Sequence, residues 1–276
     1  MFPCIIQVPD LLRISQYVQV TLETGPLYES LSRVFSGTYN PTPVHEFLAQ
    51  IPTRIAALRT SRREMAMRAG EPPPRLEDLP SFPIIVTTNY DDLMESAFDE
   101  RGQEYDLVFF RPSRSLEDVG SFWHRAPDHS QIRIDRANSY PYAFGRERPV
   151  VLKIHGTIDR TSSDAQGFVI TEDDYIEYLA VQPLETLLPQ SLLGQIQTGH
   201  LLFMGYSLRD WNCRVFLRRL WSDKTRRRKA WAVMHFSDAN DQELDQSFWD
   251  RNGVRIWPMD LIRYINSVFA ALDGTV

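Results

Sequence analysis

The sequence predicts an α/β fold in which helices flank a mostly parallel sheet, with a helical N-terminal subdomain in front of it. Two observations predict this fold. The first 80 residues carry helical apolar periodicity, and five short apolar runs alternate with helical patterns from residue 82 onward. Short, unbroken apolar strands that alternate with helices are typical of a parallel sheet covered on both faces. A chain of 276 residues can bury one substantial core of this kind.

We therefore expect a single domain over residues 1–276, with a helical part over residues 1–80 and an α/β core over residues 81–276. The predicted N-terminal helices cover residues 10–22, 25–35 and 43–59. Pro52 is expected to break the third helix, because an internal proline removes a backbone donor and clashes with the preceding turn. Charges and three consecutive prolines predict an exposed connection over about residues 60–80.

The strands of the core are expected at the apolar runs, residues 82–88, 149–156, 200–207, 229–236 and 253–258. Helices are expected at residues 91–101, 171–180, 207–221 and 260–272. Thr171 and Asp174 have the spacing of a capping box at the start of the second of these helices. Residues 111–148 contain aromatic residues and prolines without a clear period, so we expect an insertion or flap near the sheet edge. This alternation of strands and helices describes a Rossmann-like architecture.

The composition argues against several classes of protein. A formal net charge of −6 disfavours general affinity for nucleic acid or anionic membrane, because phosphate binding depends on clustered Lys and Arg. The basic run at residues 224–229 is interpreted as a solvated connection, with a contact for an acidic partner or nucleic acid as the alternative, of which the acidic overall charge disfavours nucleic acid. No signal peptide is evident, and no apolar segment reaches the roughly 18 residues of a membrane span. We therefore expect a cytoplasmic protein.

No metal site is predicted. The two cysteines, Cys4 and Cys213, are too few for a disulfide framework or a thiolate zinc site. The histidines outside the motifs described next lack metal-like spacing: His45, His124, His129, His200 and His235.

Polar and small residues follow three of the predicted strands, where an open parallel sheet binds its ligands. They are Thr87, Thr88, Asn89 and Asp91 after the first, His155 and Gly156 after the second, and Gly205 and Ser207 after the third. Small residues and helix amides can cradle phosphate, and an amide with a carboxylate can hold ribose hydroxyls or water. A histidine with a pKa near neutrality can act as a general base.

Each of these groups also has a structural explanation. Asn89 or Asp91 could cap the following helix, and His155 could be a structural histidine at a strand end. Gly205 and Ser207 fit an ordinary tight turn. The presence of all three groups at neighbouring strand ends favours a ligand site.

The motifs at these positions are similar to those of a known family. "TTNYD" resembles the Thr-Gln-Asn-Ile-Asp motif of sirtuins, "KIHG" their catalytic His-Gly, and "FMGYSLRDWN" the Gly/Ser turn that contacts the dinucleotide. The ordered set "TTNYDDLME", "HGTID", "ITEDDY" and "GYSLRDWN" is closer still to bacterial sirtuin-like NAD-hydrolysing domains of antiviral defence systems. These motifs span residues 86–212, about half of the chain.

The resemblance implies an NAD site. By position, Asn89 would hold the attacking water or the nicotinamide ribose, and Asp91 would order that corner of the pocket. His155 would act as the base at the ribose hydroxyls or the water. Further contacts to NAD would come from Thr87, Thr88 and Gly156 and, on the phosphate or adenosine side, from Gly205 and Ser207.

The reaction implied by the resemblance is hydrolysis of the nicotinamide–ribose bond. In this bacterial branch the resulting loss of NAD arrests an infected cell before the virus can spread, which is abortive infection. Such a toxic activity has to stay off without a trigger. The resemblance therefore also implies a homo-oligomer under the control of a partner, such as an ATPase, or of an attached sensor.

The sequence departs from the family pattern in two places. The zinc module with two Cys-x-x-Cys pairs is absent, which favours NAD hydrolysis over protein deacylation. No Gly-Ala-Gly-x-Ser loop occurs between Met1 and Asp10. The alternative function is therefore a catalytically silent sirtuin-like module that assembles with a partner such as an ATPase. Retention of Asn89, Asp91 and His155 argues against this alternative. Transfer of ADP-ribose or removal of acyl groups is a third, weaker hypothesis.

Overall fold

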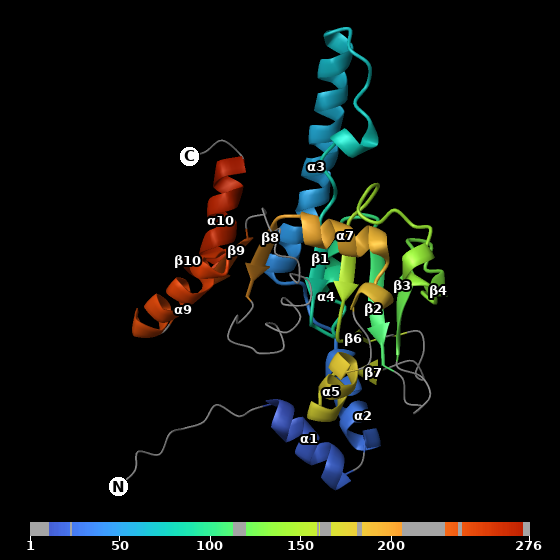
Figure 1. The fold of residues 1–276 in the computed structure, drawn as a ribbon, viewed down its shortest axis with the longest axis vertical. Coiled ribbons are helices and arrows are strands. Elements are labelled where there is room, and N and C mark those ends of the chain that lie inside the picture. The colour runs from blue at the N-terminus through green and yellow to red at the C-terminus, as the bar shows by residue number, and fades with distance from the viewer. Residues whose placement is uncertain are drawn as a thin grey trace.

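The computed structural model describes residues 11–22, 24–112, 120–158, 160, 167–180, 184–205, 230–236 and 239–272. It has the predicted α/β architecture, with mostly parallel strands flanked by helices and a helical N-terminal region (Figure 1). The Rossmann-like fold class is therefore confirmed.

The larger sheet has five strands in the order β1-β5-β2-β3-β4. They are β1 (Ile84–Thr87), β2 (Asp106–Arg111), β3 (Ser121–Arg125), β4 (Gln131–Arg133) and β5 (Val150–Lys153). β5 pairs in parallel with β1 and β2, and β3 and β4 extend the sheet in antiparallel fashion beyond β2. The apolar sequence of β5 suits this central place, because every residue of the strand is buried.

The smaller sheet contains three parallel strands in the order β10-β9-β8. They are β8 (Leu201–Met204), β9 (Ala230–Met234) and β10 (Val254–Pro258), and a short ribbon of β6 (Gly156–Thr157) and β7 (Gly167–Phe168) follows β5. The five predicted apolar runs all contain strands. They divide between two sheets, and among the described residues β1 and β8 are edge strands that do not pair with each other.

The sequence did not predict β2, β3 or β4. β2 contains four consecutive apolar residues after a charged turn, and its pairing between β5 and β3 makes it a buried strand. β3 and β4 lie in the segment over residues 111–148 that was expected to be irregular, at the edge of the sheet.

The N-terminal region contains the three predicted helices, α1 (Leu11–Leu22), α2 (Thr24–Phe35) and α3 (Pro43–Arg68). Two expectations about α3 are wrong. The helix continues through Pro52, which is buried together with Phe47 and Ala49, so packing of this face offsets the roughly 3 kcal/mol that an internal proline loses. The helix also extends to Arg68, because the residues after position 60 include good helix formers such as Arg, Glu, Met and Ala. Figure 1 shows its C-terminal half projecting beyond the sheet.

The remaining helices are α4 (Leu93–Asp99), α5 (Glu172–Ala180), α6 (Leu184–Leu187), α7 (Gln190–Thr198), α9 (Ala239–Arg251) and α10 (Leu261–Leu272). Short 3-10 turns cover Leu76–Asp78 and Ala137–Ser139. The helix expected at residues 207–221 lies outside the described residues. None of the helices in the described ranges has the length and apolar character needed to cross a bilayer.

Apolar side chains fill both faces of the larger sheet. One cluster joins the sheet to α3 and α4 and includes Ala49, Met94, Phe98, Leu107 and Phe109. The other lies between the sheet and α5–α7 and includes Phe110, Phe144, Leu152, Leu188 and Leu192.

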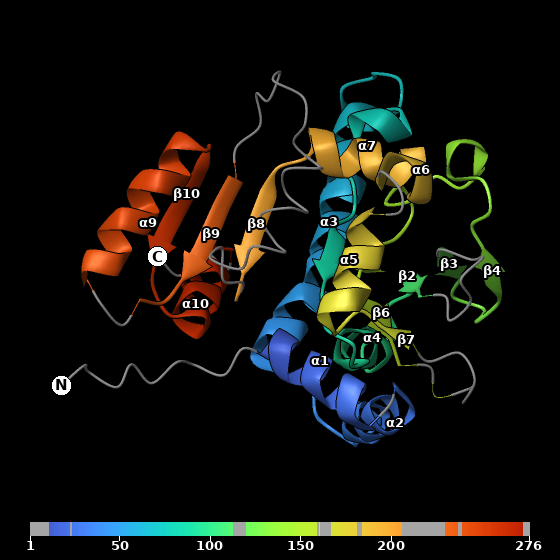
Figure 2. The ribbon, with the colours of Figure 1, turned by 60° about the horizontal axis from the view of Figure 1, so that its bottom comes forward.

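Helices α1, α2 and α5 lie beyond the carboxyl ends of the parallel strands of the larger sheet (Figures 1 and 2). α1 packs against both α2 and α5. The capping box predicted at the start of α5 is present: Thr171 Oγ1 accepts the N–H of Asp174 over 3.2 Å, and the Asp174 carboxylate accepts the N–H of Thr171 over 2.9 Å. The N-terminal helices therefore lie at the sheet edge where the sequence places the candidate site.

Candidate functional site

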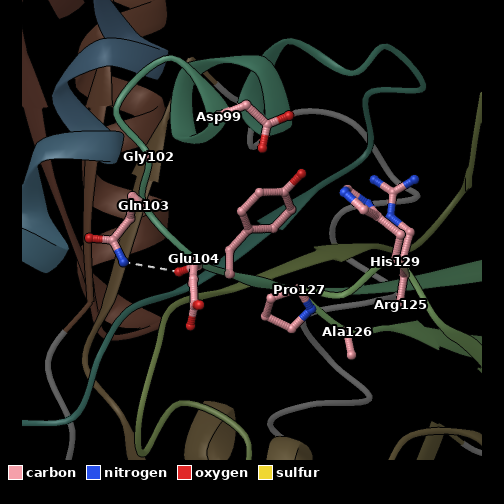
Figure 3. Close-up of a pocket in the computed structure, with 9 residues that line it drawn as sticks. Asp99, Gly102, Gln103, Glu104, Arg125, Ala126, Pro127 and His129 are labelled. Atoms are coloured by element: carbon pink, nitrogen blue, oxygen red, sulfur yellow. Dashed lines mark hydrogen bonds between the residues drawn. The ribbon is translucent and has the colours of Figure 1, made fainter.

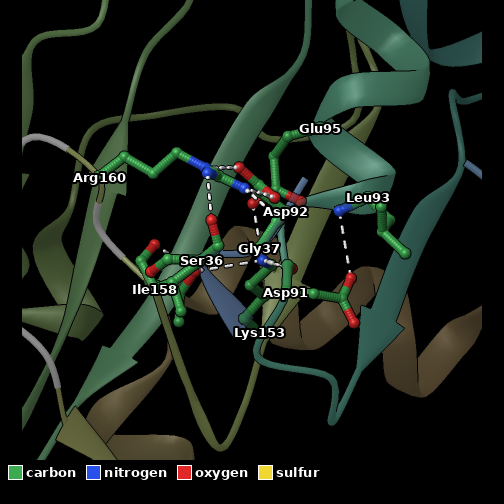
Figure 4. A network of polar contacts seen from close by, with 10 residues as sticks. Ser36, Gly37, Asp91, Asp92, Leu93, Glu95, Lys153, Ile158 and Arg160 are labelled. Atoms are coloured by element: carbon green, nitrogen blue, oxygen red, sulfur yellow. Dashed lines mark hydrogen bonds and ion pairs between the residues drawn. The ribbon is translucent and has the colours of Figure 1, made fainter. Parts of the chain in front are cut away.

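The first half of the candidate site is the loop that follows β1. The backbone N–H of Asn89 donates to the Thr87 hydroxyl over 3.0 Å, which turns the chain after the strand. Asn89 is exposed. One carboxylate oxygen of Asp91 accepts the backbone N–H of Leu93, at the start of α4, over 3.1 Å (Figure 4). Helix capping, the structural explanation, is thus one role of Asp91.

The side chain of Tyr90 anchors this loop to the chain around Phe168 and to the end of α2. Its hydroxyl donates to the Val169 carbonyl over 2.7 Å. Its ring lies 4.9 Å from the ring of Phe168 and 5.1 Å from the ring of Phe35. Tyr90 is partly buried against this aromatic cluster, so the residue that follows Asn89 is anchored and the loop presents Asn89 from a fixed backbone.

The second half of the candidate site is His155, which follows β5. Thr87 of β1 is paired with Lys153 of β5, so the two loops leave the sheet side by side. His155 is only 5% exposed. The rings of Tyr175 and Tyr178 on α5 meet its ring edge-on, with centroids at 5.0 and 5.8 Å. The Tyr175 hydroxyl lies 3.1 Å from Nδ1 of His155.

Burial lowers the pKa of His155 to about 4, so its imidazole is neutral at physiological pH. The sequence suggested a pKa near neutrality, and the difference arises because α5 covers the ring. A neutral imidazole carries one N–H. In the tautomer that donates Nδ1–H to the Tyr175 oxygen, Nε2 keeps a lone pair that can accept a proton or a hydrogen bond from a hydroxyl or water. A neutral ring also does not repel positive charge that develops on a substrate.

A buried ion pair connects the two halves. Lys153 Nζ lies 2.7 Å from Glu95 Oε1, and the two side chains are 1% and 4% exposed. The same ammonium donates to the backbone carbonyl of Asp91 and, over 3.1 Å, to the Thr157 hydroxyl (Figure 4). Lys153 therefore links β5 to α4 and to the loop that carries Asn89.

Gly156 is required by the backbone itself. Its φ is 105°, and a Cβ at this position would lie 2.2 Å from the carbonyl oxygen of Gly167 on β7. Only glycine permits this approach. The close approach accounts for Gly156 without invoking a ligand.

The predicted site residues fall into three groups. Thr87, Thr88, Asn89 and Asp91 lie beside His155 and Gly156 at adjacent strand ends. Gly205, with a φ of 64°, follows β8 in the smaller sheet and faces the Leu261 side chain of α10. Ser207 lies outside the described residues.

A protein-family model described as "SIR2-like domain" matches residues 83–257, more than half of the chain. The chain belongs to the SIR2-like family. The matched segment contains both loops of the candidate site. The resemblance to sirtuin-like domains stated from the sequence is therefore confirmed.

Two relatives agree with this assignment. The chain is 28% identical over 133 residues to "Defense-associated sirtuin 2" of Bacillus subtilis, which covers 48% of this chain and 10% of that protein. It is 30% identical over 155 residues to "NAD(+) hydrolase ThsA" of Acinetobacter baumannii (strain 532279), which covers 55% of this chain and 25% of that protein. The matched parts thus span about a tenth and a quarter of these relatives.

Figure 3 shows a pocket of about 210 Å³, whose lining includes no residue of the two loops of the candidate site. It is lined by Asp99, Gly102, Gln103, Glu104, Tyr105, Arg125, Ala126, Pro127 and His129. Tyr105 immediately precedes β2, so the pocket lies at the amino end of a parallel strand. Ligands of open parallel sheets bind at the opposite, carboxyl ends. The two loops at the carboxyl ends therefore remain the candidate site.

Sequence reasoning missed three residues that contact this candidate site. They are Tyr175, whose hydroxyl is next to His155, Lys153, which supports the loop, and Arg160, which forms an ion pair with Asp92. Lys153 lies inside the "KIHG" motif, and a lysine at the end of an apolar strand is a usable signal for a buried ion pair. Among the described residues, no group of three or more His, Cys, Asp and Glu could hold a metal ion.

The buried state of His155 predicts a pH dependence of stability. The unfolded histidine binds a proton below about pH 6.5, whereas the folded one does so only below about pH 4. The unfolded state therefore binds more protons between these values, and the free energy of unfolding falls as the pH falls. We expect His155 alone to account for a loss of roughly 2–4 kcal/mol between pH 7 and pH 4.

Denaturant unfolding of the wild type and His155→Gln across this range measures the effect. The wild type should lose more stability on acidification than the variant, in which position 155 cannot titrate. Parallel curves for the two proteins would contradict the buried, neutral histidine.

Proposed function

We propose that this SIR2-like domain hydrolyses the nicotinamide–ribose bond of NAD+, and that this activity depletes NAD in antiphage defence by abortive infection. The observation that carries the proposal is the pair of loops with Asn89 and His155, which leave adjacent parallel strands and are joined by buried Lys153. The printed names of the two relatives, a defence-associated sirtuin and an NAD(+) hydrolase, support the same chemistry and setting.

Asn89 and His155 take the catalytic roles in this proposal. Asn89 is exposed on a fixed loop, so its amide can hold the nicotinamide ribose or the attacking water. His155 is neutral, so it accepts a hydrogen bond from a ribose hydroxyl or from that water. The carboxylate of Asp91 orders the part of the pocket next to Asn89. Further contacts to NAD come from Thr87, Thr88, Gly156, Gly205 and Ser207.

The proposed reaction needs no cofactor, because NAD+ is the substrate. The bond between C1′ of the ribose and the ring nitrogen of nicotinamide breaks, and its electron pair neutralises the pyridinium ring. The water oxygen bonds to C1′, and its proton passes through His155 to solvent. The products are nicotinamide, ADP-ribose and one proton. Positive charge develops on the ribose on the way, so the domain acts by positioning the ring and by keeping a neutral base beside that charge.

The proposal includes control from outside the domain. Uncontrolled loss of NAD would harm the host cell, so the activity has to respond to a trigger. We propose a homo-oligomer whose activity is set by a partner protein, such as an ATPase, or by an attached sensor. The alternative is a catalytically silent interaction module. Such a module would not need an exposed asparagine beside His155 on a loop that Lys153 holds in place.

The experiment is NAD turnover by the wild type and by Asn89→Ala. The change should abolish NAD loss without changing the melting temperature, because Asn89 is exposed and contributes to the fold through its backbone N–H. Asn252→Ala is the matched control, since this asparagine is also exposed and its side chain donates to the Phe248 carbonyl of the preceding helix α9 over 2.8 Å.

The assay should be repeated in infected cells, because purified protein can lack its trigger. Equal NAD loss with wild type and Asn89→Ala would contradict the proposed site. Intact NAD under every condition would favour the silent module.

A further inference from the structure

Helix α2 contacts the first half of the candidate site directly and is linked to the second half through α5, although it lies more than fifty positions before the first half in the sequence. Three sets of contacts make this connection. One is apolar and involves the ring of Tyr90, one involves Arg160, and one runs through α5 to His155.

The apolar contact joins the end of α2 to the loop after β1. The ring of Phe35, the last residue of α2, lies 5.1 Å from the ring of Tyr90 and 5.8 Å from the ring of Phe168. Tyr90 stands between Asn89 and Asp91 in the sequence. The last turn of α2 therefore packs directly against the residue that fixes the Asn89 loop.

Arg160 makes the second connection (Figure 4). Its Nη2 lies 2.9 Å from one oxygen of Asp92, and its Nε contacts the other oxygen. Its Nη1 donates to the Ser36 carbonyl over 2.8 Å, and Nη2 also donates to the Gly37 carbonyl over 3.3 Å. These carbonyls follow α2, where a helix presents oxygens without intrahelical partners. One guanidinium thus joins the end of α2 to the residue after Asp91.

The charge state of Asp92 is consistent with this contact. Burial alone would raise the pKa of Asp92, but the hydrogen bond and charge of Arg160 outweigh it and lower that pKa. Arg160 is about half exposed, so the pair adds little to global stability. Its two-point geometry instead fixes orientation.

The third connection reaches His155 through α5. The Tyr28 hydroxyl, in the middle of α2, lies 2.9 Å from the Phe168 carbonyl and 3.0 Å from the Asp174 carboxylate. Asp174 also accepts the backbone N–H groups at the start of α5, which sets the position of that helix. The next residue, Tyr175, places its hydroxyl 3.1 Å from His155.

We propose that Tyr28 and Arg160 are positioning residues, through which α2 holds the Asn89 loop and His155 in register. This inference rests on the proposed function for its effect on catalysis, and on the contacts alone for its effect on structure. It makes the helical N-terminal region part of the site. A displacement of α2 would misalign both halves at once.

The test compares Tyr28→Phe and Arg160→Gln with matched controls. Tyr39→Phe removes a hydroxyl that bonds to the Val34 carbonyl, also on α2, over 2.9 Å but has no contact with Asp174. Arg75→Gln removes an exposed arginine paired with Glu77 and Asp78, away from the site. The readouts are hydrogen exchange of the backbone and NAD turnover, measured on the whole chain.

We expect exchange to accelerate by about tenfold in residues 89–93 of Arg160→Gln and in residues 172–178 of Tyr28→Phe, with β5 unchanged. We expect kcat for NAD to fall by roughly tenfold or more in both variants while KM changes little, because small misplacements of reacting groups lower rates steeply. Arg160→Lys should recover part of the loss. The controls should match the wild type.

Wild-type exchange in both segments would overturn the proposal. Faster exchange spread evenly over the sheet would also overturn it, because the residues would then support global stability only. If the wild type does not consume NAD, the exchange data still decide this inference, and the proposed function alone fails. Unchanged kcat together with faster local exchange would show that the contacts hold the loops without positioning them for catalysis, which also contradicts the proposal.

Discussion

Replacing Lys153 with methionine is expected to destabilise the domain by about 3–5 kcal/mol, because it leaves a buried carboxylate without its counter-charge. Glu95 is 3% exposed, and in the described part of the chain its second oxygen, Oε2, has no hydrogen-bond partner. The substitution also removes the donor to the Asp91 carbonyl. A loss of this size is a large part of the roughly 5–15 kcal/mol that holds a typical domain together. Denaturant unfolding measures it directly.

The double variant Lys153→Met with Glu95→Leu separates charge from packing. Replacement of both partners by apolar residues of similar volume is often close to neutral. We therefore expect the double variant to recover most of the lost stability, even if Lys153→Met alone is too unstable to purify. The Asp91 carbonyl still lacks its donor, so NAD turnover should stay low in the double variant. A stable Lys153→Met protein would contradict the buried ion pair.

Replacing His155 with glutamine is expected to lower NAD turnover by about 10²–10⁴-fold, the range that general acid–base groups contribute. Glutamine can still form a hydrogen bond inside the site, but it cannot take up the proton of the attacking water. Because the pKa of His155 is about 4, turnover by the wild type should depend little on this residue's protonation between about pH 5 and pH 8.

The matched control is His235→Gln, an exposed histidine that follows β9 in the smaller sheet. It should retain wild-type turnover. The melting temperature of both variants at pH 7.5 shows whether a loss of activity reflects unfolding. Near-normal turnover by a folded His155→Gln would remove His155 from the mechanism.

Much of the fold could be predicted from the sequence, because short unbroken apolar runs mark the strands of a parallel sheet. β1, β5, β8, β9 and β10 were found in this way. β2 was missed although it contains four consecutive apolar residues, and its central place follows from its pairing with β5 and β3, which no local pattern reports. The course of α3 through Pro52 depends on burial of one helix face, which a local rule for proline does not include.

The residues of the candidate site also fall into those that a local pattern predicts and those that depend on distant contacts. Asn89, Asp91 and His155 could be proposed because they follow predicted strands directly. Their supports could not, because Tyr28, Glu95 and Arg160 reach the site from other elements, and Arg160 is 68 positions from its partner Asp92. The low pKa of His155 depends on coverage by α5, and no local pattern reports that coverage.

The most direct measurement of the central claim is the stoichiometry of products from NAD+, followed by chromatography with the wild type and Asn89→Ala. We expect nicotinamide and ADP-ribose to appear in equal amounts as NAD+ disappears, and we expect Asn89→Ala to form neither product. Nicotinamide without free ADP-ribose would instead indicate transfer to another acceptor. NAD+ that stays intact with the wild type, in purified form and in infected cells, would contradict the claim.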